Sequence, residues 1–218
     1  MNRIIKNPYA RMLKVAVATL CVANNLSFVK FFLRISLLVI TGMIACENAT
    51  DDDKSQVIEK EINGIAFKFC LLNEHGKPAT VFGEGENFNF YFSVANQSKK
   101  DFYYNAGELS YNKSFLCVYD SSGFDFGKSY HPLPQRDIGI AAYPFKNGSV
   151  HIIKVPWLHE KDSVMCAENF CYKSHIQKPL VKGSYYTGFK YSFYLQGQQD
   201  ENTIKTDSIN FQINFKIQ

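Results

Sequence analysis

Four residues in the last third of the chain have side chains that could form a disulfide or bind a metal ion. They are His159, Cys166, Cys171 and His175. The two cysteines bracket four residues and could close a small loop, through a bond that persists in oxidising compartments. The spacing Cys-x4-Cys-x3-His lacks the tight Cys-x2-Cys pair of common structural zinc sites. We therefore take Cys166 and Cys171 as a candidate disulfide, keep free thiols as an alternative, and predict no metal site and no cofactor.

Two further cysteines, Cys70 and Cys117, lie within runs that resemble β-strands. They could be buried thiols or a cross-strand pair. Together with Cys166 and Cys171 they allow three complete pairings, and the sequence does not select among them.

The motifs of the common enzyme classes are missing from the sequence. The segment Gly83-x-Gly85-x-x-Phe88 lacks the third glycine of a dinucleotide-binding loop and leads into a predicted strand instead of a helix. No Gly-x-Ser-x-Gly, His-Glu-x-x-His or Walker pattern occurs. We interpret His131 and His151 as surface or packed histidines. We predict no catalytic residues and therefore a protein that is not an enzyme.

A secretory signal is predicted at the N-terminus. Lys30 and Arg34 precede the apolar run 35–45, which ends in the small residue Ala45 and is followed by Cys46. The run has eleven residues, whereas a membrane-spanning helix needs about 20. We assign residues 1–45 as a signal peptide. Translation could instead start at Val29, in which case residues 1–28 would not be part of the protein.

A cysteine directly after the cleavage point resembles a bacterial lipoprotein signal. That resemblance implies lipid attachment at Cys46 and a membrane as partner, although Met43 stands where such signals usually carry leucine. The acidic run after Cys46 resembles the export signal of Bacteroidetes lipoproteins, which implies a lipid-anchored location on the outer membrane facing the cell exterior. Residues 46–56 would then be the lipidated cysteine and an acidic tether, which can reach about 35 Å.

The charge balance of the mature part argues against nucleic acid as a partner. Residues 1–45 hold six of the 24 lysines and arginines and none of the 20 acidic residues. Residues 46–218 therefore carry 18 basic and 20 acidic groups, a net charge of −2. A nucleic-acid-binding domain would be expected to carry a basic face.

Residues 57–218 are predicted to form one all-β domain. Apolar residues alternate with polar ones over 64–72, 83–96, 182–195 and 209–217, which is the period-two pattern of half-buried strands. Shorter strands are expected at 102–104, 115–119 and 148–155, and one short helix at 157–167. Seven or eight antiparallel strands with turns between them favour an immunoglobulin-like β-sandwich.

Two local motifs carry a family resemblance. The segment Leu180-x-x-Gly183-x-Tyr185 has the spacing of a tyrosine corner, in which a phenol donates a hydrogen bond to nearby backbone. With Gly85-Glu-Asn-Phe-Asn-Phe and Asn96, it looks like bacterial immunoglobulin-like lipoprotein domains. It is also distantly similar to the bacterial intracellular proteinase inhibitor domain. The resemblance covers about half of the mature chain and concerns the fold more than the function.

The expected function is that of a non-catalytic binding or accessory lipoprotein. Its loops, or an aromatic face bearing Tyr91, Tyr186 and Tyr194, would contact a protein or a glycan. Two alternatives stay open at this point. One is a proteinase-inhibitor-like module, and the other is a hydrolase whose site is assembled from distant residues.

Overall fold

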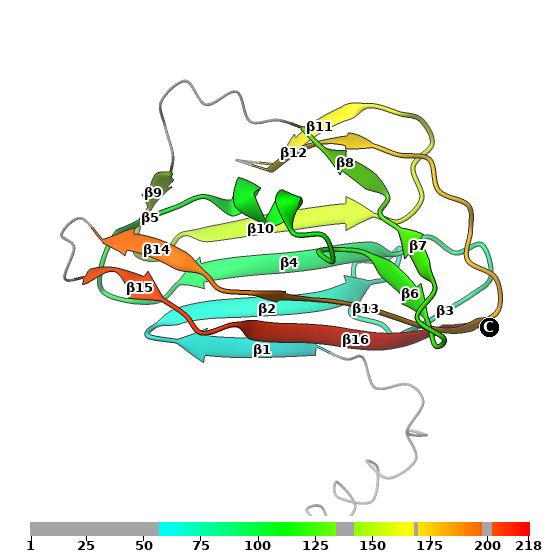
Figure 1. Ribbon diagram of the computed structural model, residues 1–218, viewed down its shortest axis with the longest axis horizontal. Coiled ribbons are helices and arrows are strands. Elements are labelled where there is room, and N and C mark those ends of the chain that lie inside the picture. The colour runs from blue at the N-terminus through cyan, green and yellow to red at the C-terminus, as the bar shows by residue number, and fades with distance from the viewer. Residues whose placement is uncertain (1–56, 134–141, 168–169, 198–201) are drawn as a thin grey trace, which may run out of the picture. The chain divides into compact units, whose positions relative to one another are not determined.

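The computed structural model describes residues 57–133, 142–167, 170–197 and 202–218 (Figure 1). The predicted signal peptide, Cys46 and the tether lie outside these residues. No helix within the described ranges has the length and apolar character needed to cross a bilayer.

The first large sheet is antiparallel and has four strands. In spatial order they are β1 (Val57–Ile62), β2 (Ile65–Leu72), β4 (Asn89–Asn96) and β10 (Val150–Pro156). Asn63 and Gly64 join the first two strands and both have positive φ, at 54° and 77°. Positive φ at both central residues is the geometry of a type I′ two-residue hairpin turn.

The second large sheet has five strands and contains the C-terminus. In spatial order they are β3 (Val81–Phe82), β16 (Ile209–Ile217), β13 (Gly183–Tyr191), β6 (Val118–Asp120) and β7 (Asp125–Gly127). The short β3 pairs with β16 in parallel, and the other pairs are antiparallel. Every second residue of β16 is buried, as its alternating sequence predicts.

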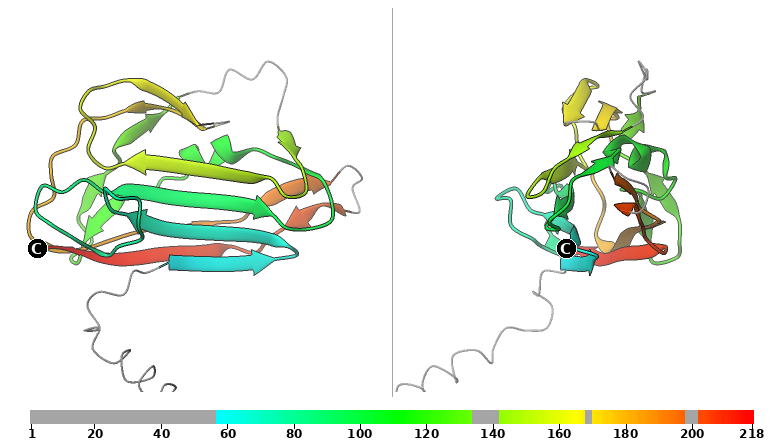
Figure 2. Two further views of the ribbon diagram at one scale, coloured as in Figure 1. Left: turned by 180° about the vertical axis from the view of Figure 1, so that it is seen from behind. Right: turned by 90° about the vertical axis from the view of Figure 1, so that its left-hand side faces the viewer.

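The core lies between the inner faces of these two sheets, which lie on opposite sides of the fold in the end-on view (Figure 2, right). Phe69 of β2 contacts Phe189 of β13 edge to face, with ring centres 5.4 Å apart. Phe92 of β4 contacts Phe211 of β16 in the same way at 5.6 Å. These four rings are almost fully buried. Burial of each such ring contributes about 1.5–3 kcal/mol relative to leaving it exposed.

Two smaller sheets and one helical turn complete the described part of the chain. One sheet holds β11 (Val164–Ala167), β12 (Phe170–Ser174) and β8 (Tyr130–Pro132). The other holds β15 (Ile204–Lys205), β14 (Tyr194–Gly197), β5 (Phe102–Tyr104) and β9 (Tyr143–Phe145). A 3-10 helix, η2 (Ala106–Tyr111), follows β5 and is capped by Asn105, whose side chain accepts a hydrogen bond from the backbone N–H of Gly107.

The all-β prediction is confirmed, but three local predictions were wrong. No helix forms over 157–167. Instead Trp157 is buried against Phe88, and the end of that segment becomes β11, which pairs with β12. The strand predicted at 115–119 begins only at Val118, because Leu116 has φ of 57° and the chain turns there.

Residues 182–195, which were predicted to form one strand, form two strands. β13 ends at Tyr191, and β14 begins at Tyr194 in a different sheet. The break is fixed at Phe193, whose backbone N–H donates to the hydroxyl of Thr206 while its ring enters the core.

Candidate functional site

A trough with a volume of about 490 Å³ lies on the outward side of the five-stranded sheet. This volume falls within the range of about 300–1,000 Å³ that small-molecule sites occupy. The lining combines a loop with residues of three strands: Asn112, Lys113, Ser114, Tyr119, Tyr186, Gly188, Phe189, Lys190, Asn210, Phe211 and Gln212. We call this feature the tyrosine trough.

Two stacked tyrosines line one part of the trough. Tyr119 of β6 and Tyr186 of β13 are directly paired in the antiparallel register. Their ring centres lie 5.1 Å apart, with only 18° between the ring planes. Both side chains are half-buried. An offset stack is a favourable arrangement of two aromatic rings, so the pair forms one continuous aromatic surface.

Gly188 is the next outward-facing position of β13 after Tyr186, and it also lines the trough. A Cβ atom on Gly188 would lie 2.4 Å from the carbonyl oxygen of Phe211 and 2.9 Å from Cα of Gln212. The backbone of β16 therefore approaches β13 too closely for any side chain here. Gly188 therefore adds no side chain to the lining of the trough next to Tyr186.

Polar side chains provide most of the remaining lining. The side-chain amide of Asn112 donates to the carbonyl of Lys190 at 2.8 Å, which ties the loop after η2 to the end of β13. Asn210 and Gln212 project from β16 into solvent. Lys113 and Lys190 are the two charged residues of the lining, and both are positive.

A cluster of titratable groups lies next to the tyrosine pair. The thiol of Cys117 donates to Oδ1 of Asp125 at 2.9 Å. Burial and this hydrogen bond raise the pKa of Cys117 to about 11. The thiol is therefore protonated at neutral pH and acts as a hydrogen-bond donor, in contrast to the low-pKa thiolate of a nucleophilic cysteine. Burial, together with contact with Cys117, raises the pKa of Tyr119 to about 12.

Lys128 connects this cluster to the loop that lines the trough. Its Nζ donates to the carbonyl of Asn112 at 2.6 Å and lies 5.2 Å from the ring centre of Tyr130. Burial lowers the pKa of Lys128. No sequence pattern predicted this cluster, because its members converge only when β6 and β7 form their hairpin. The turn-rich segment 120–127 next to Cys117 was the one available signal.

The three tyrosines that were predicted to share one aromatic face do not share it. Tyr91 projects from β4 on the outer side of the four-stranded sheet, and Tyr186 projects from the five-stranded sheet. Tyr194 belongs to β14 in a third sheet, where 56% of it is exposed. The partner of Tyr186 is instead Tyr119, 67 positions earlier in the chain.

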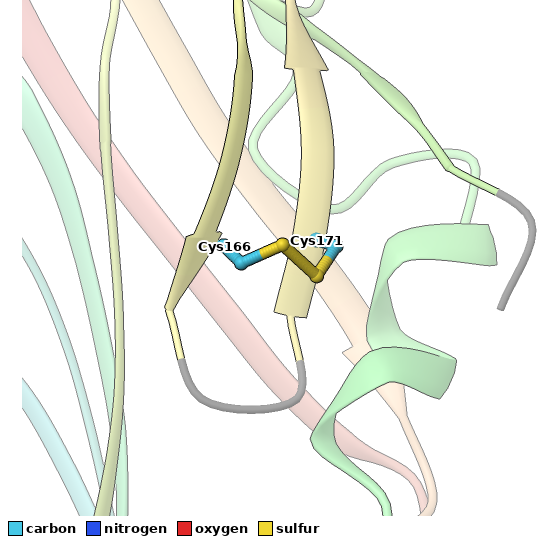
Figure 3. The surroundings of a disulfide bond; sticks show 2 residues. All are labelled: Cys166 and Cys171. Carbon is cyan, nitrogen blue, oxygen red and sulfur yellow. A yellow bond between two sulfur atoms is a disulfide. The ribbon is translucent and has the colours of Figure 1, made fainter.

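The cysteines and histidines with possible zinc-ligand character are not assembled into one site. Cys166 and Cys171 face each other across β11 and β12 and form a disulfide, with their Cα atoms 4.1 Å apart (Figure 3). His159 is half-buried, and burial lowers its pKa. His175 lies beside His131 instead. No group of three or more His, Cys, Asp or Glu side chains within the described ranges is positioned to hold one metal ion.

The remaining predicted residues occupy structural positions. The hydroxyl of Tyr185 donates to the carbonyl of Val181 at 2.7 Å, four residues earlier in the chain. Cys70 and Cys117 are buried free thiols. Cys46, the predicted lipid attachment site, lies outside the described residues.

No protein-family model and no curated protein matches this chain.

Proposed function

We propose that the protein is a lipid-anchored binding lipoprotein of the outer membrane, facing the cell exterior. The support is the apolar run that ends at Ala45, the cysteine that follows it and the acidic tether up to residue 56. Two acyl chains on Cys46, at about 0.8 kcal/mol per buried methylene, would make the attachment effectively permanent.

The domain carried by this anchor is an immunoglobulin-like β-sandwich. This proposal is supported by the two large sheets whose inner faces meet through Phe69, Phe92, Phe189 and Phe211. It is also supported by the hydrogen bond from Tyr185 to Val181 at the start of the penultimate long strand, where immunoglobulin-like folds have their tyrosine corner.

The tyrosine trough is the ligand surface, and its ligand is a carbohydrate chain. The face of an aromatic ring is electron-rich and packs well against the weakly positive C–H groups of a sugar ring. Amide side chains both donate and accept hydrogen bonds, so Asn210 and Gln212 match the hydroxyl groups of a sugar. The trough is open to solvent along the sheet, which suits a segment of a longer polymer.

One observation carries this proposal: the stack of Tyr119 and Tyr186 beside Gly188, which has no side chain to cover the rings. Elsewhere on β13 and β16 the outward positions hold polar or charged side chains at Ser184, Lys190 and Lys216. The tyrosine pair is therefore an aromatic patch on a mainly polar surface. The protonated thiol of Cys117 next to it favours a binding role over a hydrolytic one.

Affinity electrophoresis against a panel of soluble polysaccharides tests this function. The mature protein in detergent should be retarded by at least one of them. Tyr186→Ala should weaken that binding by about 2 kcal/mol, or roughly thirtyfold, as expected for a central aromatic residue of an interface. Tyr194→Ala is the matched control, because Tyr194 is an exposed tyrosine outside the trough. Equal retardation of Tyr186→Ala and wild type, or no retardation by any polysaccharide, would overturn the proposal.

A further inference from the structure

Two exposed histidines lie side by side on the three-stranded sheet, away from the tyrosine trough. His131 is in β8, and His175 directly follows β12. Lys173 pairs with His131 in the register, and the backbone N–H of His175 donates to the carbonyl of Ser129 at 2.8 Å. Residues 173 and 175 share one face of the sheet, so both imidazoles project from the same side.

The burial pattern agrees with this placement. Tyr130 and Ser174, which alternate with the two histidines along their strands, are buried, whereas His131 and His175 are exposed. The two rings are therefore open to solvent, and an ion could reach them without any rearrangement of the core.

The spacing of the two rings matches that of two imidazoles on one metal ion. Their ring centres lie 4.9 Å apart, with 60° between the planes. With metal–nitrogen bonds of about 2.0–2.1 Å, two imidazoles on one ion have ring centres about 4.5 Å apart at a right angle and about 5.2 Å apart at a tetrahedral angle. The observed separation lies between these values.

β12, the strand that His175 follows, is tied to the segment 161–167 by hydrogen bonds and a disulfide. The hydroxyl of Ser174 donates to the carbonyl of Lys161 at 2.9 Å and accepts from the backbone N–H of Ser163 at 2.7 Å. The disulfide between Cys166 and Cys171 ties the same strand to β11. His175 therefore extends from a firmly held strand, and sites built on strands are more precise than sites built on loops.

We propose that His131 and His175 form a two-histidine binding site for a late first-row divalent metal ion, such as Cu²⁺, Ni²⁺ or Zn²⁺. Neutral imidazole suits these ions, and affinity for nitrogen ligands rises along the series to Cu²⁺. The remaining coordination positions would be taken by water or by an external ligand. Lys173 lies opposite His131, with Nζ 3.9 Å from Asp162, and its positive charge opposes metal binding.

Isothermal titration with NiCl₂ and ZnCl₂ tests this site on the mature protein purified without an affinity tag. We expect one ion per chain. His131→Ala and His175→Ala should each weaken binding at least about tenfold, since even outer-shell substitutions cost about 10–100-fold at metal sites. His75→Ala, which changes an exposed histidine in the turn after β2, should bind like wild type. Lys173→Ala should bind more tightly, because it removes a nearby positive charge.

The same titrations can overturn the proposal. A wild-type isotherm that matches that of the His131→Ala/His175→Ala double variant would show that the pair holds no ion. A loss of binding in His75→Ala, with the two single variants unaffected, would place the ion elsewhere. All four histidine variants change exposed side chains, and circular dichroism would verify that each is folded.

Discussion

Cys117 and Tyr119 are held in their neutral, protonated forms by their surroundings. The pKa of Cys117 is raised to about 11 by burial and by its bond to Asp125, and the pKa of Tyr119 is raised to about 12, mainly by burial. The folded state therefore holds both protons more tightly than the unfolded chain does. Both groups contribute stability that is present at neutral pH and lost as the pH rises.

Because the two pKa values are raised in the folded state, the fold should lose stability at alkaline pH. The free energy of unfolding should be constant near pH 7 and fall from the ordinary thiol pKa of about 8.5 up to about pH 11. Urea titrations at pH 7.5, 9.0 and 10.5 would measure it. Cys117→Ala should show a shallower decline over the same range, because one of the shifted groups is gone. Identical slopes for the variant and the wild type would contradict the assignment to Cys117.

The hydroxyl of Tyr185 makes a contact whose removal can be measured. Tyr185→Phe keeps the ring but leaves the carbonyl of Val181 without its donor. We expect a loss of about 1 kcal/mol in the free energy of unfolding, the usual net contribution of such a bond. Tyr194→Phe, which changes an exposed ring, should lie within about 0.5 kcal/mol of wild type. If the two variants were equally stable, the bond would have no role in the fold.

Contacts within a few residues could be predicted from the sequence, and distant ones could not. The pairs Cys166–Cys171 and Val181–Tyr185 are local, so their spacing alone made them candidates. The stack of Tyr119 on Tyr186 depends on the pairing of β6 with β13, and the contact of His131 with His175 depends on the pairing of β8 with β12. Neither pairing leaves a signal in a single sequence.

The long strands of the two large sheets could be predicted from the period-two pattern of the sequence. β2, β4 and β16 bury one face against the opposing sheet, so every second residue must be apolar. The strand β11 could not be predicted from its own sequence. It is an edge strand with exposed Val164 and Met165, held by β12 and the disulfide, and the helical prediction for 157–167 failed because tertiary pairing outweighed local preference.

Because β13 and β16 approach each other closely at Gly188, a side chain at this position should destabilise the sheet. Gly188→Ala would place its Cβ against the carbonyl of Phe211 and force the strands apart. We expect a loss of about 1–3 kcal/mol in thermal or urea unfolding, as for other overpacked positions. Ser184→Ala, at an exposed position on the same face of β13, is the control and should be nearly neutral. A Gly188→Ala variant as stable as the control would mean that the strands can separate freely there.

At the scale of the whole molecule, the location of the protein and its ligand surface are inferred from different residues. The location is inferred from residues 30–56, which lie outside the described structure, and the ligand surface is inferred from the tyrosine trough. The all-β character followed from the sequence alone. The position of the trough did not, because its lining comes from segments that are close only after the five-stranded sheet has formed.

Binding of a fluorescent polysaccharide, chosen from the electrophoresis panel, to intact cells tests both parts together. Cells that produce wild-type protein or Tyr194→Ala should bind it. Tyr186→Ala cells should not, although antibody detects the protein on their surface. Cys46→Ala cells should also fail to bind, because the unlipidated protein is not retained. Undiminished binding by cells carrying Tyr186→Ala, or full surface retention of Cys46→Ala, would contradict the account.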